Sequence, residues 1–88
     1  MYYVYVIEGT SKKNRKEYYI SYTANLKNRI KKHKNESNKT TKKLKKIKLI
    51  YYEACLNEKD ARKREQSLKT GFGRGYLKRR LANYYQSL

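Results

Sequence analysis

The stretch YISYTANLKNRIKKH, residues 19–33, contains a strand followed directly by a helix, and this transition decides the fold. Its beginning belongs to the aromatic and β-branched run EYYISY (residues 17–22), which predicts a strand. Thr23 can cap the helix that follows. Because Leu26 and Ile30 lie one helical turn apart, they give this helix an apolar stripe.

Two basic side chains border that stripe. Arg29 and His33 are four residues apart, so a helix that runs to about Lys34 places both on one face. Upstream, YYVYVIE (residues 2–8) predicts another strand, and the polar, glycine-containing GTSKKNRK (residues 9–16) predicts a basic turn. The N-terminal half is therefore expected to be a β-hairpin followed by a helix.

Alternation along the first strand separates its side chains onto two faces. One face carries Tyr3, Tyr5 and Ile7, and the other carries Tyr2, Val4 and Val6. Tyr5 and Tyr19 fall on adjacent strands of the hairpin, and we expect its register to bring them near each other.

The C-terminal half adds a strand and a capped helix. A lysine-rich polar stretch (residues 35–46) predicts an exposed loop, and IKLIYYEA (residues 47–54) predicts a third strand paired with one or both of the others. Asn57 is a good cap for a helix through about Lys69, with Asp60 at its third position in a capping-box-like arrangement.

Three closely spaced glycines follow this helix. Gly71 is expected to end it, and GFGRG (residues 71–75) predicts a flexible hinge. Beyond the hinge, Leu77, Leu81 and Tyr84 give a final helix an apolar stripe. The expected fold is a single α+β domain (residues 1–88) of α/β-sandwich type. It has a small three-stranded antiparallel sheet flanked by three helices, in the order β-β-α-β-α-α.

The charge balance points to a polyanionic partner. Among 88 residues, 24 Lys and Arg against 7 Asp and Glu give a net charge of +17 at pH 7. Nucleic acid is the first candidate partner, and an anionic membrane surface is the second. The basic stretches lack the apolar face that inserts into a membrane, so nucleic acid is preferred, and no small-molecule substrate is expected.

Cysteine usage and hydropathy exclude several classes of protein. No apolar run is long enough to cross a bilayer, and no signal-peptide core is present. Cys55 is the single cysteine, which excludes an intrachain disulfide and a cysteine-cluster zinc site. A reducing cytoplasm is the expected location.

Common catalytic motifs are missing, and the simplest interpretation of the remaining polar residues is a structural one. The sequence has no HExxH, no GxxxxGK[ST] and no GxSxG. A single histidine such as His33 is more often structural than catalytic. Glu65, four residues before Lys69, is most simply a surface carboxylate in a weak helical ion pair.

A resemblance to a known protein family favours a catalytic role for these residues instead. Tyr3-Val4-Tyr5 and Tyr19-Ile20-Ser21 resemble the first and second motifs of the GIY-YIG nuclease superfamily, and residues 19–33 are similar to its YIGYTxNLxxRIxxH. Further stretches resemble small stand-alone bacterial members of the excinuclease nuclease-domain type: KLIYYEA (residues 48–54), DARKREQSLK (residues 60–69) and GFGRGYLKRRL (residues 71–81). The motifs occur in order over nearly the whole chain.

The resemblance implies a divalent-metal-dependent endonuclease that hydrolyses phosphodiester bonds, in DNA ahead of RNA, and leaves 5′-phosphate and 3′-hydroxyl ends. It implies that Glu65 holds one Mg²⁺ or Mn²⁺ ion, which suits a site with few acids. It implies that Arg29 contacts the scissile phosphate. Tyr5 and Tyr19 match the tyrosines that position or deprotonate the attacking water, and His33 shares the base role or binds phosphate.

The chain departs from the family pattern at Ser21, where the second motif ends in glycine. If the site needs positive φ, serine costs about 1 kcal/mol or more. If it needs only close approach, serine fits and its hydroxyl can contact phosphate. Two alternatives therefore stay open beside the enzyme: a catalytically impaired nucleic-acid-binding module of the same fold, and an RNA-associated basic protein.

Further residues are candidates for contact with nucleic acid. They are Ser21, Tyr22, Lys39, Lys42, Lys43, Lys45, Lys46, Arg74, Lys78 and Arg79. The sequence leaves open whether the substrate is single-stranded, duplex or branched, and which oligomeric state the protein adopts.

Overall fold

The computed structural model describes residues 1–35 and 44–87. Within them, three strands form one antiparallel sheet in the order β2-β1-β3, accompanied by four helices. The elements are β1 (Tyr2–Thr10), β2 (Lys16–Thr23), α1 (Leu26–Lys34), β3 (Lys45–Cys55), α2 (Glu58–Leu68), α3 (Gly71–Arg80) and α4 (Ala82–Gln86). The predicted α+β class and element order are confirmed, and the last predicted helical region consists of α3 and the short α4.

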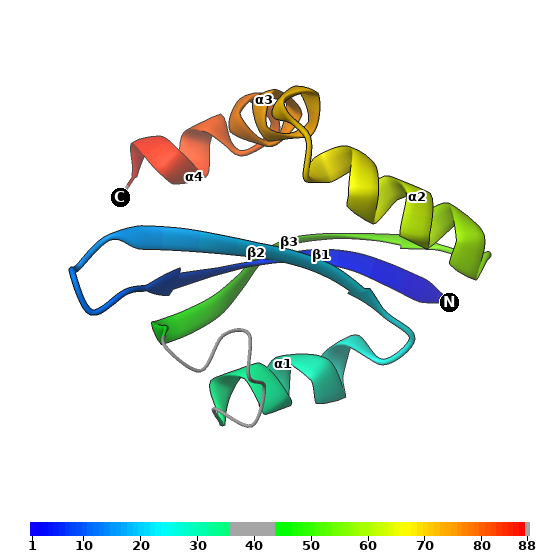
Figure 1. Cartoon of the computed structure of the whole chain (residues 1–88), viewed down its shortest axis with the longest axis horizontal. Helices are drawn as coiled ribbons and strands as arrows, with labels where there is room; N and C mark the ends of the chain where they lie inside the picture. The colour runs from blue at the N-terminus through cyan, green and yellow to red at the C-terminus, as the bar shows by residue number, and fades with distance from the viewer. Residues whose placement is uncertain (36–43, 88) are drawn as a thin grey trace.

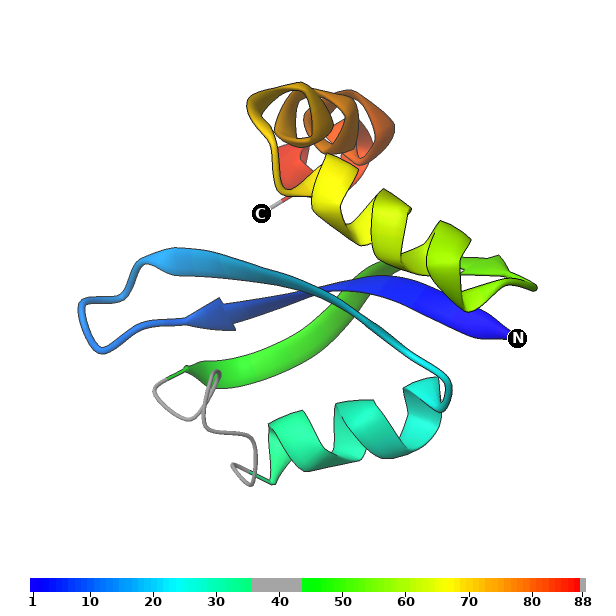
Figure 2. The same ribbon diagram turned by 45° about the vertical axis from the view of Figure 1, so that its right-hand side comes forward.

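The helices form two layers around the sheet. Helix α1 lies on one face, and α2, α3 and α4 cover the other (Figure 1). The turned view in Figure 2 keeps the same separation. Within the described ranges, no helix has the length and apolar character needed to span a membrane.

Strand β1 is the centre of the molecule, and its side chains are buried on both faces. Val4 and Val6 pack with Ala61, Leu68 and Leu77 in the core beneath α2 and α3. The alternate residue Tyr5 lies on the α1 face, so the predicted separation onto two faces is confirmed. Such burial on both sides explains why this strand is aromatic and aliphatic nearly throughout.

The hairpin register confirms that the motif tyrosines are neighbours. Tyr5 lies opposite Ser21, and Ile7 lies opposite Tyr19. Tyr5 and Tyr19 are therefore diagonal neighbours on the face of the sheet covered by α1.

The cap of α1 is not the residue that was expected. Asn25 is the N-cap, and its side-chain oxygen accepts a hydrogen bond from the Asn28 backbone N–H at 3.1 Å. Thr23 ends β2, and its hydroxyl accepts from the Asn25 backbone N–H at 3.1 Å. Thr23 thus organises the turn between strand and helix, whereas α2 begins at Asn57 as predicted.

The predicted glycine hinge is wrong, because residues 71–75 are helical. Thr70 caps α3 by accepting from the Gly73 backbone N–H at 3.1 Å, and none of the glycines has a positive φ. A Cβ on Gly73 would overlap the Ser67 carbonyl oxygen and lie 2.6 Å from the Leu68 carbonyl carbon. The glycine at position 73 therefore lets α3 pack directly on the end of α2.

The lysine-rich loop is shorter than expected. Lys45 and Lys46 belong to β3, where Lys45 lies opposite Thr10 at the end of the sheet. Both lysine side chains are exposed. The other candidate contacts in this loop, Lys39, Lys42 and Lys43, lie outside the described residues.

The contact at Gly73 gives a prediction about stability. Gly73→Ala places a methyl group against immovable backbone, and we expect it to lower the free energy of unfolding by about 1–3 kcal/mol. The matched control is Gly71→Ala in the same helix, where an added Cβ meets no atom within 4 Å. Urea titrations followed by circular dichroism measure both. A wild-type urea midpoint for Gly73→Ala would contradict the close packing of α3 on α2.

Candidate functional site

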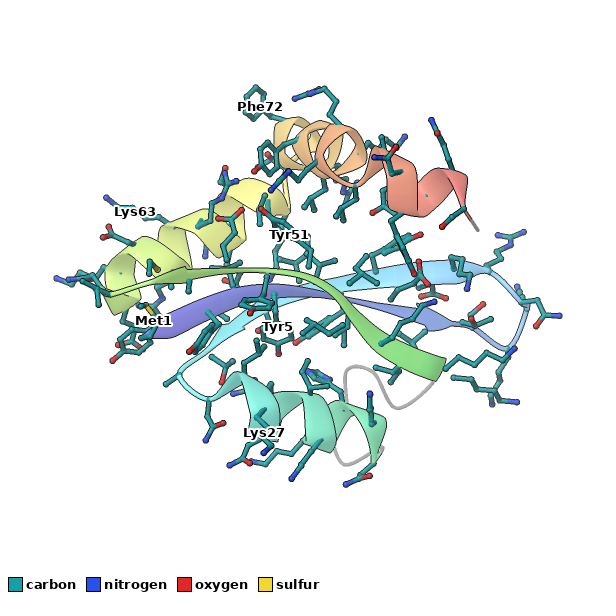
Figure 3. All side chains as sticks on the ribbon, turned by 180° about the vertical axis from the view of Figure 1, so that it is seen from behind. Met1, Tyr5, Lys27, Tyr51, Lys63 and Phe72 are labelled. Carbon is teal, nitrogen blue, oxygen red and sulfur yellow. The ribbon has the colours of Figure 1, made fainter. Side chains whose placement is uncertain are left out.

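A buried pair of side chains lies between the sheet and α1. The Tyr5 hydroxyl and His33 Nε2 are 2.9 Å apart, and both residues are 0% exposed. The His33 ring also contacts the Tyr19 ring, with 5.4 Å between centroids. Figure 3 shows Tyr5 on the α1 side of the sheet, with Tyr51 on the opposite side. The two motif tyrosines therefore converge on one histidine.

Arg29 adds a positive charge to this cluster. It precedes His33 by one turn of α1 and is partly buried. Burial raises the pKa of Tyr5, and hydrogen bonding to Ser21 and the charge of Arg29 oppose that rise. Burial and then Arg29 lower the pKa of His33 below its ordinary value. At neutral pH, Tyr5 is therefore a neutral phenol and His33 a neutral imidazole.

Ser21 fits this site without backbone strain. It lies within β2 opposite Tyr5, and it is not among the residues with positive φ. The site therefore does not need the conformational freedom of glycine at this position. The Ser21 side chain is partly exposed and interacts with the Tyr5 hydroxyl.

Glu65 belongs to the other layer, on α2. Its side chain is only 12% exposed, and its partner among the described residues is Lys69, at 3.4 Å. Glu58, also on α2, lies on the face of this helix that borders β2. Its Oε2 accepts a hydrogen bond from the Tyr22 hydroxyl of β2 at 3.4 Å. Since Glu65 follows Glu58 by two helical turns, it lies on the same face. The Glu65 carboxylate therefore faces the β2 edge of the sheet.

A second contact fixes the rotation of α2. Arg64 binds Glu53 of β3 through Nε and Nη2, at 2.8 and 2.9 Å, and its guanidinium lies 4.7 Å from the Tyr76 ring centroid. The Tyr51 hydroxyl donates to the same carboxylate at 2.8 Å. Hydrogen bonding from Arg64 holds the pKa of Glu53 below its usual value. Arg64 is thus tied towards β3, while its neighbour Glu65 is turned towards β2.

A groove of about 440 Å³ runs between β2 and α3, and we call it the β2–α3 groove. Tyr18, Tyr19 and Leu77 give it an aromatic and apolar lining, and Lys69, Arg74 and Lys78 supply positive charge. It joins the two layers, because Tyr19 contacts His33 on one side and Lys69 pairs with Glu65 on the other.

The predicted site residues fall into three groups. Tyr5, Tyr19, Ser21, Arg29 and His33 gather on the α1 side of the sheet, whereas Glu65 lies in the opposite layer, on the same face of α2 as Glu58 and paired with Lys69. Arg74 and Lys78 line the β2–α3 groove, and Arg79 is exposed outside its lining. Tyr22 points towards α2, and Lys45 and Lys46 lie at the far end of β3.

Sequence reasoning missed Tyr18 and Lys69 as parts of the site. The alternation of β2 places Tyr18 on the opposite face from Tyr19, and that much was readable. The groove itself forms only because α3 packs against this face. The sequence predicted a hinge over residues 71–75, where α3 begins, so this packing was not expected.

One of three comparisons with known proteins identifies a family. The family model of the GIY-YIG catalytic domain matches residues 1–77, which include every site residue just described except Lys78 and Arg79. The searches of curated proteins and of solved structures give no match. Since the matched region is most of the chain, the protein belongs to the GIY-YIG catalytic domain family of nucleases.

Proposed function

We propose that this protein is a divalent-metal-dependent endonuclease that cleaves nucleic acid, DNA ahead of RNA, to 5′-phosphate and 3′-hydroxyl ends. One observation supports this most directly: the buried Tyr5–His33 hydrogen bond lies beside Arg29 and beside Tyr19 of β2, the edge strand towards which the Glu58 and Glu65 face of α2 is turned. Phosphodiester hydrolysis is helped by positive charge at the phosphate, a proton acceptor for the water and a carboxylate that holds a metal ion. Arg29 and the Tyr5–His33 pair supply the first two from the α1 side of the sheet, and Glu65 supplies the carboxylate from α2.

Exposure distinguishes the roles of these residues. Arg29 and Tyr19 are partly exposed, so they contact the substrate: Arg29 binds the scissile phosphate and Tyr19 orients the attacking water. The buried neutral His33 accepts a proton through the Tyr5 hydroxyl that it hydrogen-bonds. As the water oxygen bonds to phosphorus, the bond from phosphorus to O3′ breaks, and O3′ takes a proton from solvent.

Glu65 is the residue that fits a metal ion. The described residues contain no group of three or more His, Cys, Asp and Glu side chains that could hold a metal. Glu65 nevertheless offers a mostly buried carboxylate with one long contact, and Mg²⁺ commonly takes one or two protein carboxylates with water and phosphate oxygens. When bound, the ion supplies positive charge that stabilises the phosphate and the leaving oxygen.

The first test compares two glutamates on one face of α2. Glu65→Gln removes the proposed metal ligand, and we expect cleavage of labelled DNA or RNA in Mg²⁺ or Mn²⁺ to fall at least about a hundredfold. The control Glu58→Gln changes the same charge two turns away and should cleave like wild type. Binding in EDTA should survive in both variants. Undiminished cleavage by Glu65→Gln would rule out this site.

The second test uses the single histidine of the chain. In an NMR titration, His33 should show a pKa below the ordinary 6.5, and cleavage should be lost as pH falls through that same value. The lowered pKa means that the unfolded chain binds this proton more tightly. The His33 contribution to stability is therefore complete above pH 6.5 and declines as pH falls towards the lowered pKa.

Arg29→Gln should raise the His33 pKa, because it removes a nearby positive charge. The exposed Lys63→Gln is the matched control and should leave that pKa unchanged. A His33 pKa at or above 6.5 in the wild-type protein would contradict a buried neutral acceptor.

The third test measures salt dependence. On single-stranded DNA, the logarithm of affinity should fall with the logarithm of salt concentration, with a slope near −0.7 per phosphate contact. Lys78→Gln in the β2–α3 groove should reduce the slope by about one contact. Lys63→Gln removes the same charge from the outer face of α2 (Figure 3) and should leave it unchanged. Equal losses for both variants would mean that overall charge, and not the groove, governs binding.

A further inference from the structure

We propose that the β2–α3 groove holds a single-stranded stretch of nucleic acid beside the cleavage point, with an unpaired base stacked on Tyr18. The inference rests on the proposed function for its position next to the scissile phosphate. It goes further by naming the substrate class: strands with an unpaired segment, either free or branching from a duplex.

The lining of the groove matches both parts of a nucleotide strand. Lys69, Arg74 and Lys78 bring three cations to the α side, where backbone phosphates are attracted. Tyr18 and Leu77 bring an aromatic ring and an apolar surface, on which bases pack. A groove with cations and an exposed ring is the combination that single-strand-binding sites use, and it needs no particular base sequence.

The Tyr18 ring packs against the ring of Tyr85 on one side. It is 44% exposed, and its ring meets the Tyr85 ring edge-on, with 5.8 Å between centroids and an interplanar angle of 78°. Helix α4, which carries Tyr85, is anchored by the Tyr84 hydroxyl, which donates to Glu8 Oε1 at 2.9 Å. Glu8 is only 1% exposed. The ring therefore keeps its orientation while part of its surface is available to a ligand.

The phenol of Tyr18 is neutral at physiological pH, as an ordinary tyrosine is, and its environment raises its pKa further. Burial and the nearby Glu8 carboxylate raise the pKa of Tyr18 to about 12. A neutral ring avoids placing a negative charge next to phosphates at physiological pH.

A base inside a duplex is stacked on both faces and paired along its edge, so it cannot stack on Tyr18 without leaving the helix. An unpaired base has a free face. The groove also contains Tyr19, which contacts His33, so a strand in the groove passes directly beside the candidate catalytic cluster. The unpaired nucleotide is therefore adjacent to the phosphate that is cut.

The other edge strand, β3, borders a second groove, and Tyr52 in that groove is the matched control for Tyr18. Tyr52 on β3 is 52% exposed and meets the Tyr3 ring at 6.0 Å between centroids. It lines a groove of about 580 Å³ between α1 and β3, together with Lys27, Lys31 and Lys34. This groove is similar in character, but its strand lies across β1 from Tyr19.

The experiment measures binding in EDTA, by fluorescence anisotropy, of a labelled single strand and of a blunt duplex. Tyr18→Leu should weaken binding of the single strand about tenfold and change binding of the duplex less than about twofold. Tyr18→Phe keeps the ring and should bind like wild type, as should Tyr52→Leu. A single strand containing 2-aminopurine should lose fluorescence on binding wild-type protein and Tyr18→Phe, and keep it with Tyr18→Leu.

Three outcomes would overturn the inference: wild-type affinity of Tyr18→Leu for the single strand, an equal loss for strand and duplex, or the loss appearing in Tyr52→Leu instead. Circular dichroism melting verifies that Tyr18→Leu is folded, and Tyr18→Phe tests the ring independently if it is not. Cleavage in Mg²⁺ or Mn²⁺ is scored separately. Absence of cleavage with Tyr18-dependent binding would refute the endonuclease alone, and cleavage without that binding would refute only the groove.

Discussion

The structure depends on one constraint, which is that β1 is buried on both faces. Its alternating side chains are committed to two layers, with Tyr5 under α1 and Val4 and Val6 under α2 and α3. Arg29 and His33 therefore belong to one layer and Glu65 to the other. Groups in opposite layers can act on one phosphate only by meeting around an edge of the sheet. The β2 edge is where Tyr19 and the face of α2 that bears Glu65 both lie.

Three of the acidic residues tie the layer of α2, α3 and α4 to the sheet. Glu53 binds Arg64, Glu58 accepts from Tyr22, and Glu8 accepts from Tyr84, so each ties α2 or α4 to the sheet. With a net charge of +17, carboxylates at such contacts also offset repulsion within the folded chain. Tyrosine suits this construction because its ring packs in the interior while its hydroxyl reaches a carboxylate. The abundance of tyrosine thus has a structural reason in several of its positions.

Local patterns were enough to predict the hairpin, the neighbouring tyrosines and the shared face of Arg29 and His33, because short-range periodicity determines all of them. Features that depend on tertiary packing were not accessible in this way. The glycine at position 73 serves contact with α2, and its neighbours in space cannot be read from GFGRG. The β2–α3 groove and the direction of Glu65 likewise follow from how α2 and α3 are placed on the sheet.

An edge strand leaves backbone donors and acceptors unpaired, and such strands invite pairing with another chain. Here Lys69, Arg74 and Lys78 lie close to β2, the edge strand with which a strand of another chain could pair. The same cations that attract a polyanion therefore repel a like-charged copy of the protein. Attraction of a polyanion and repulsion between copies of the chain therefore have a common origin in these three cations.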